Sequence, residues 1–388
     1  MTHAYRAALV ALGALALAQP SCTGGSSFFY GDTGVAATDA DAAPPSDALL
    51  EGGFDAFKPY DGGKAKDALP GCKPQNFTLK QAPPAEVYLV LDRSGSMNDK
   101  APSATLTKWK ELNGAADFVL KKYESSIYFG LLMYPSDSMC KTPGPQVKVD
   151  LNNRAAVLSF LSKATPAGGT PTAAALNNAA NSLATLGNKS AKKYLVLATD
   201  GGPNCNYLLS SAPKCSCTYA TSPDYCCTSH PTATCSVGHT CLDDANSLSV
   251  IKAIRASKGI TTFVIGLEGT AEYVTLLEAM AIAGGAPQTG GTTSYYKASS
   301  NTDLQNALNV IAASVISCTI DLVQKPKYPD YVLVYLDGKS VPRDKSKTNG
   351  WDFLDATMTK IKLYGTYCKK LQDGTKHTLT ATFKCEVN

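Results

Sequence analysis

The stretch of sequence that decides the fold is Glu86-Val87-Tyr88-Leu89-Val90-Leu91-Asp92-Arg93-Ser94-Gly95-Ser96. Its first half is apolar and rich in β-branched residues, a composition that predicts a short buried strand. Its second half is polar and begins where this strand ends. Open α/β sheets bind their ligands at the carboxyl ends of strands, so these polar residues are candidates for a binding site.

Further strands and helices alternate along the chain after this first strand. The hydrophobic pattern predicts strands over 127–133, 146–151, 194–199, 261–265 and 293–297. It predicts helices over 104–123, 153–163, 171–186, 243–258, 271–283 and 302–316. Because a short Pro/Gly loop joins the second and third strands, these two should be antiparallel neighbours. The pattern predicts an α/β fold with a doubly wound, mostly parallel, six-stranded sheet covered by helices on both faces.

The last part of the chain, residues 318–388, has a different pattern. Residues 331–341 alternate between apolar and polar side chains, with Asp337-Gly338 placed as a hairpin turn. The pattern gives no convincing helix, and His377 has no obvious partner. This region predicts a small antiparallel β-domain of the sandwich kind.

The first residues indicate export. Arg6 precedes an apolar run over 7–18 that is too short to cross a bilayer, as in a signal peptide over 1–21. Cys22 follows and resembles the lipid-attachment site of a bacterial lipoprotein, although an ordinary cleaved signal peptide is the alternative. Residues 22–71 are rich in Ala, Gly, Asp, Pro and Ser, which predicts a disordered tether. The α/β domain is then expected over 72–317.

Two further short segments complete a recognisable pattern. Gly168-Gly169-Thr170-Pro171-Thr172 precedes a predicted helix, and Thr199-Asp200-Gly201 ends a predicted strand. With the D-x-S-x-S sequence of Asp92, Ser94 and Ser96, these segments resemble von Willebrand factor A domains of the integrin I-like type. The resemblance covers about residues 86 to 316. It implies a Rossmann-like fold and a metal-ion-dependent adhesion site.

The resemblance also implies a role for each residue of that site. Ser94, Ser96 and Thr170 would bind the metal directly, and Asp92 and Asp200 would act mainly through water. Hydroxyl and carboxylate oxygens are hard ligands that suit Mg²⁺, or Mn²⁺ or Ca²⁺, rather than Zn²⁺. Neutral ligands leave the charge of the ion largely unquenched, so an open position could take a Glu or Asp carboxylate of a protein partner.

The function classes can be narrowed further. The net charge of +4 is small for 388 residues and by itself argues neither for nor against a nucleic-acid partner. We predict a protein partner and no nucleic acid. The chain has four His and none of the common hydrolase or nucleotide-binding motifs, so we expect no enzyme. The prediction is a cell-surface binding or adhesion protein, exported to the envelope and attached to a membrane only through a lipid anchor, or secreted. The alternatives are a surface scaffold whose metal only stabilises it and, with less support, a metal-assisted hydrolase.

The cysteines fit an oxidising compartment. There are 13, so if Cys22 carries lipid the other twelve can pair. Several lie in an insertion over 203–241, where a zinc site is the alternative to disulfides. We expect a Cys140–Cys205 bridge, Cys72 and Cys318 joining the ends of the α/β domain, and Cys368 bonded to Cys385. The remaining candidates are Cys215, Cys217, Cys226, Cys227, Cys235 and Cys241.

Overall fold

The computed structural model describes residues 76–77, 79–102, 104–185, 188–211, 218, 240–326 and 329–383. The expected signal peptide (1–21), the lipidation candidate Cys22 and the tether (22–71) lie outside these residues. So do the disulfide candidates Cys72, Cys215, Cys217, Cys226, Cys227, Cys235 and Cys385. In the part of the chain that is described, no helix has the length and apolar character needed to cross a membrane.

A six-stranded sheet forms the centre of the larger domain, in the order β5-β4-β3-β6-β7-β8. The first strand of the motif, β3 (Ala85–Asp92), runs parallel to its neighbours β4 (Ile127–Tyr134) and β6 (Lys193–Thr199). The strands β7 (Thr261–Leu267) and β8 (Tyr296–Ala298) continue the parallel sheet on one side. At the other edge, β5 (Val147–Asp150) is antiparallel to β4, as the short loop between them predicts.

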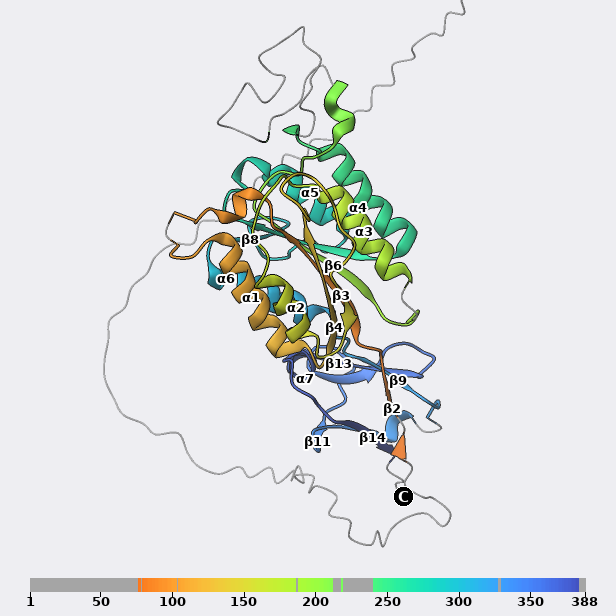
Figure 1. Cartoon of the computed structure of the whole chain (residues 1–388). Helices are drawn as coiled ribbons and strands as arrows, with labels where there is room; N and C mark the ends of the chain where they lie inside the picture. Colours follow the sequence, from red (N-terminus) through yellow and green to blue (C-terminus); the bar gives the residue numbers. More distant parts are fainter. Residues whose placement is uncertain are drawn as a thin grey trace, which may run out of the picture. The chain divides into compact units, whose positions relative to one another are not determined.

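Helices cover both faces of this sheet (Figure 1). Alternate residues of β3 point to opposite faces: Val87, Leu89 and Leu91 lie in one hydrophobic core, and Tyr88 and Val90 in the other. The helices of the first core are α1 (Lys108–Tyr123), α2 (Arg154–Leu161) and α6 (Asn301–Val315). Those of the second are α3 (Thr172–Thr185), α4 (Asp244–Lys258) and α5 (Val274–Gly284). The predicted doubly wound α/β fold is therefore confirmed.

The smaller domain consists of two four-stranded antiparallel sheets that share one hydrophobic core. Trp351 is its largest fully buried side chain, with its ring edge-on to Phe353 at 5.4 Å between ring centres. Asp337 and Gly338 both have positive φ, the backbone that the predicted Asp-Gly hairpin turn requires. The strands from the C-terminal region are β9 (Thr319–Leu322), β10 (Val332–Leu336), β11 (Lys339–Val341), β12 (Gly350–Phe353), β13 (Lys360–Tyr364) and β14 (Leu379–Phe383).

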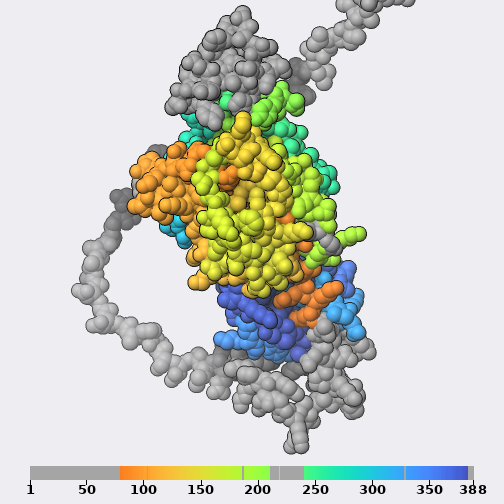
Figure 2. Space-filling view, viewed as in Figure 1, coloured from red at the N-terminus to blue at the C-terminus, as the bar shows by residue number. Residues whose placement is uncertain are grey.

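Two strands of the smaller domain come from before the α/β domain, which corrects the expected boundary at residue 72. The strand β1 (Asn76–Phe77) pairs with β14, and β2 (Leu79–Gln81) pairs with β9. Figure 2 shows the orange atoms of this early segment among the blue atoms of the C-terminal strands. Strands of two and three residues carry too little pattern to be found in the sequence. The α/β domain is thus inserted between two paired strands of the β-domain.

The C-terminal region also contains a helix, α7 (Gly365–Leu371), where the sequence predicted none. It has only seven residues, too few for a helical hydrophobic repeat to be recognised. Cys368 of this helix is bonded to Cys318. The predicted pairings of Cys72 with Cys318 and of Cys368 with Cys385 are therefore wrong, because α7 brings Cys368 next to the start of β9.

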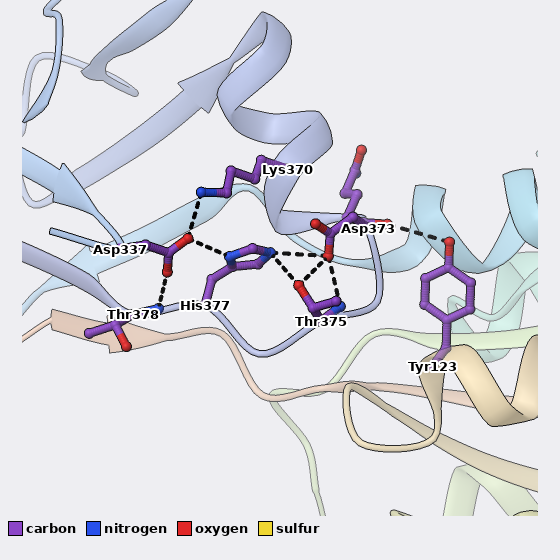
Figure 3. Close-up of polar contacts among 8 residues, drawn as sticks. Tyr123, Asp337, Lys370, Asp373, Thr375, His377 and Thr378 are labelled. Carbon is purple, nitrogen blue, oxygen red and sulfur yellow. Dashed lines mark hydrogen bonds and ion pairs between the residues drawn. The ribbon is translucent and has the colours of Figure 1, made fainter. Parts of the chain in front are cut away.

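A polar cluster closes the β-domain around His377 (Figure 3). The ring Nδ1 lies 2.8 Å from Asp337 Oδ2, and Nε2 lies 3.0 Å from Asp373 Oδ1, so the expectation that His377 lacks a partner is wrong. Lys370 also contacts Asp337 Oδ2, at 2.7 Å. Burial lowers the pKa of His377, but the hydrogen bonds to the two carboxylates outweigh it and the pKa is raised above 6.5. The partners lie on the 337–338 turn and the 372–378 loop, so a charged His377 ties these two segments together.

Replacing His377 by glutamine is expected to lower the thermal unfolding midpoint at about pH 5.5 but hardly at about pH 9. The raised pKa means that the stabilisation is fully present below the unfolded-state pKa and is lost as the pH rises through the folded-state pKa. Thermal melts followed by circular dichroism across this range give the measurement, with Lys376→Gln as an exposed control in the same loop. An equal loss at every pH would mean that packing of the ring, rather than its charge, stabilises the loop.

Candidate metal site

The predicted metal-binding residues follow the carboxyl ends of two adjacent strands. Asp92 is the last residue of β3, and Asp200 comes directly after β6, which lies beside β3. Ser94 and Ser96 lie in the loop after β3, where a 3-10 turn spans Gly95–Asn98. Thr170 lies just before α3. The parallel pairing of β3 and β6 therefore places both acidic residues at the carboxyl ends of the strands, on the same side of the sheet.

Hydrogen bonds link three of these residues directly. The hydroxyl oxygens of Ser94 and Ser96 are 3.2 Å apart, and the Ser96 hydroxyl donates to Asp200 Oδ1 at 2.9 Å. Ser94 and Asp200 are buried, whereas Ser96 is exposed. The exposed hydroxyl of Ser96 therefore bridges two buried groups, Ser94 and Asp200.

Asp92 lies behind the two serines and is fully buried. The backbone N–H of Ser94 donates to Asp92 Oδ1 at 2.8 Å, and the hydroxyl of Thr199 donates to Oδ2 at 2.6 Å. Both carboxylate oxygens are thus engaged by neighbouring groups. This arrangement fits a residue that supports a metal through other groups better than a direct ligand.

Thr170 is positioned by its backbone. Gly95 N–H donates to the carbonyl of Gly168 at 3.0 Å, which joins the loop of Thr170 to the loop of the serines. The amide N–H of Thr170 donates to the side-chain oxygen of Asn204 at 2.6 Å, and Asn204 N–H donates back to the Thr170 carbonyl at 2.9 Å. Sequence reasoning missed Asn204, because nothing in its own neighbourhood marks it as a partner of a loop 34 residues earlier.

The predicted Cys140–Cys205 disulfide is confirmed and lies against the same loop. A Cβ atom on Gly169 would lie 2.5 Å from Cys205 Sγ, so only glycine leaves room for the sulfur there. Gly169 N–H also donates to the carbonyl of Met139, next to Cys140, at 2.7 Å. The disulfide thus anchors the residues that precede Thr170. Cys241, at the end of the insertion, is also disulfide-bonded.

Arg93, the variable residue of the D-x-S-x-S sequence, joins three loops. Its guanidinium donates to the carbonyl of Pro135 at 2.5 Å, to that of Asp137 at 3.2 Å and to that of Thr165. The loop of the serines is therefore tied to the loop after β4 and to the segment before Thr170. The family pattern gives no signal at this position, because it leaves the residue unspecified.

A lysine that the sequence analysis did not single out completes the site. Lys108 Nζ lies 2.8 Å from Asp200 Oδ2, and its side chain is 9% exposed. Gly269, at φ 107°, packs against this ion pair, since a Cβ there would lie 3.2 Å from Lys108 Nζ and 2.7 Å from the Asp200 carbonyl. Sequence alone did not reveal the contact because Lys108 and Asp200 are 92 residues apart.

The electrostatics of the site are dominated by its two buried carboxylates. Burial, followed by the charge of Asp200, raises the pKa of Asp92 to about 7. Burial also raises the pKa of Asp200, against the opposing effect of Lys108. Two buried acidic groups with a single basic group, Lys108 beside Asp200, have a shortage of positive charge.

The donor set fits a divalent cation. Three hydroxyls and two carboxylates at one edge of the sheet offer only oxygen, which suits Mg²⁺, Mn²⁺ or Ca²⁺. A divalent ion would also supply the positive charge that the two carboxylates lack. Among the residues that the structure describes, no group of three or more His, Cys, Asp or Glu could hold a metal ion. A site here would thus depend on its serine and threonine hydroxyls.

Comparison with known proteins places residues 86–308 in one family model, the von Willebrand factor type A domain. No curated protein matches the sequence. Among solved structures, the chain is similar to the pilus adhesin SpaC of Lactobacillus rhamnosus GG, at 16% identity and a TM-score of 0.45 over 81% of this chain and 41% of SpaC. It is also similar to the PilB minor pilin of Streptococcus sanguinis, at 17% identity and a TM-score of 0.42 over 60% of each chain. A third similar structure is the manganese-loaded TRAP protein of Plasmodium vivax, at 15% identity and a TM-score of 0.43 over 80% of this chain and 96% of TRAP.

The chain spans less than two thirds of the length of SpaC and of PilB.

Proposed function

Because this chain belongs to the von Willebrand factor type A domain family, we propose that it is a binding module whose metal-ion-dependent adhesion site captures an acidic group on a protein partner. The observation that carries the proposal is the hydrogen-bonded line from Ser94 through Ser96 to Asp200. Its members come from two adjacent strand ends, and only Ser96 is exposed. Such an arrangement supports an ion that is bound by protein oxygens on one side and keeps an open coordination position on the other.

In this proposal each residue has a defined task. The hydroxyls of Ser94, Ser96 and Thr170 bind the ion, and Asp92 and Asp200 act on it mainly through water. A bound Mg²⁺, or Mn²⁺ or Ca²⁺, would supply a positive charge with a coordination position open to a Glu or Asp carboxylate. The Asn204 amide and the Arg93 guanidinium hold the loops that carry Thr170 and the serines.

The surroundings of Asp92 argue against a metal-assisted hydrolase. A general base must reach the proton that it removes. Asp92 is fully buried, and both of its oxygens accept hydrogen bonds from Ser94 and Thr199. We therefore propose a non-enzymatic role.

We further propose that the protein works outside the cytoplasm, at the cell envelope or surface. Two described disulfides, Cys140–Cys205 and Cys318–Cys368, support this location, because disulfides persist in oxidising compartments. Attachment through lipid on Cys22 is a proposal that rests on the sequence alone, and secretion is its alternative.

Replacing Ser94 by alanine is expected to weaken Mg²⁺ binding by more than about tenfold, because the change removes one ligand oxygen. Isothermal titration calorimetry on the purified chain gives the measurement. Ser159→Ala serves as the control, since Ser159 is an exposed serine of α2. Equal Mg²⁺ affinity in wild type and Ser94→Ala would contradict the proposed metal site.

The partner is tested separately by capture from a surface extract in Mg²⁺, followed by washing with a chelator. Release of the captured protein by the chelator, and its absence with Ser94→Ala, is the expected result. A protein that binds Mg²⁺ but holds its partner equally well after chelation would instead be a scaffold that the metal only stabilises.

A further inference from the structure

The position of Lys108 is unfavourable for a cation that has no partner. It is the first residue of α1, where the partial positive charge of the helix end disfavours a cation. It is also buried, and a buried charge is costly unless a partner compensates for it. The compensation comes from Asp200 Oδ2, 2.8 Å away. A buried cation at a helix N-terminus, paired with an aspartate of the proposed metal site, indicates a function.

Lys108 and Ser96 use different oxygens of Asp200. Ser96 donates to Oδ1 at 2.9 Å, and Lys108 donates to Oδ2 at 2.8 Å. The side of Asp200 that faces Ser96 therefore remains free of the ammonium group. Gly269 closes over the ion pair from the loop after β7. Lys108 can thus keep its place when an ion is held on the serine side.

We propose that Lys108 is a fixed cation of the adhesion site, which sets the charge of the loaded site so that it accepts one acidic group. With both aspartates ionised around the bound ion, two carboxylates, one ammonium and one divalent ion leave a single net positive charge, which one carboxylate of a partner neutralises. Without Lys108 the loaded site would be neutral, and it would hold its metal more tightly but attract a carboxylate less. This inference rests on the proposed function.

The test compares Lys108→Met, Lys108→Arg and the control Lys110→Met, which changes an exposed lysine of the same helix. Calorimetry measures the affinity for Mn²⁺ alone. Water-proton relaxation of the Mn²⁺-loaded protein, titrated with acetate, measures binding of a carboxylate at the open position. Circular dichroism in saturating Mn²⁺ checks that each variant is folded.

Lys108→Met is expected to bind Mn²⁺ about tenfold more tightly and acetate about fivefold more weakly than the wild type does. The reason is that the positive charge of Lys108 repels the metal cation and attracts the carboxylate. Lys108→Arg and Lys110→Met should keep both affinities within about twofold. If Lys108 had only a structural role, Lys108→Met would bind Mn²⁺ more weakly than the wild type does. That result would overturn the inference. Unchanged affinities in Lys108→Met would overturn it as well.

Two further outcomes keep the inference and the proposed function separable. Absence of Mn²⁺ binding in the wild type contradicts the proposed function itself. If Lys108→Met does not fold, the test rests on Lys108→Arg, which preserves the charge. A folded Lys108→Arg variant whose acetate affinity falls by more than about fivefold would contradict the role of charge.

Discussion

Replacing Asp200 by alanine is expected to lower the free energy of unfolding by about 3–5 kcal/mol, a loss far larger than that of one hydrogen bond. The reason is Lys108, whose side chain is 9% exposed and whose ammonium group would be left without its carboxylate. Urea unfolding in the presence of a chelator gives the measurement, because metal then contributes nothing to the difference.

The double variant Asp200→Ala/Lys108→Met tests the cause of this loss. Removing both charges should restore most of the stability, since a buried charge pair can be replaced by apolar side chains at little cost. Asp117→Ala breaks a much more exposed ion pair, with Arg154, and should lose far less. A double variant no more stable than Asp200→Ala would show that the carboxylate, and not the unpaired ammonium, is responsible.

Removing the Cys140–Cys205 disulfide, by serine at both positions, is expected to lower the free energy of unfolding by about 4 kcal/mol. The bridge closes a loop of 65 residues, so its loss frees much chain entropy in the unfolded state. It is also expected to weaken Mg²⁺ binding by about tenfold, because Cys205 Sγ packs against Gly169, next to Thr170. Denaturant unfolding and calorimetry measure the two effects.

The second disulfide provides a matched control. Cys318–Cys368 has a sequence separation of 50, so its double serine variant should lose a similar amount of stability. It lies in the β-domain, at the start of β9 and in α7, and should leave Mg²⁺ affinity unchanged. If both disulfide variants weaken Mg²⁺ binding equally, general destabilisation rather than the local contact with Gly169 is the cause.

The elements of the α/β domain were predictable because their signal is local. For example, β3 ends at Asp92 and α1 ends at Tyr123. Each shows its hydrophobic pattern within one short stretch of sequence. The Cys140–Cys205 pairing was predictable because both residues follow strands whose carboxyl ends lie at one edge of the sheet. The contact of Cys318 with Cys368 was not, because it depends on a short helix that leaves no periodic signal.

The polar residues that hold the site together were not predictable from the sequence. Lys108, Arg93 and Asn204 each have a partner that only the tertiary fold brings close. The partner of Asn204 is 34 residues away in the sequence, and the partner of Lys108 is 92 residues away. In the sequence, Lys108 stands within a predicted helix, and Arg93 and Asn204 stand in predicted loops. A sequence motif identifies the groups that would contact a ligand. Identifying the groups that orient them requires the three-dimensional structure.

The insertion of one domain between two paired strands imposes an order of folding. Leu79 of β2 pairs with Leu322 of β9, so these partners are separated by the whole α/β domain. Closing a flexible loop of that length costs about 5 kcal/mol of chain entropy. Once the α/β domain has folded, its two ends are held together and most of this cost is removed. The β-domain should therefore form last, and a nascent chain keeps β1 and β2 unpaired until its C-terminal strands have been synthesised.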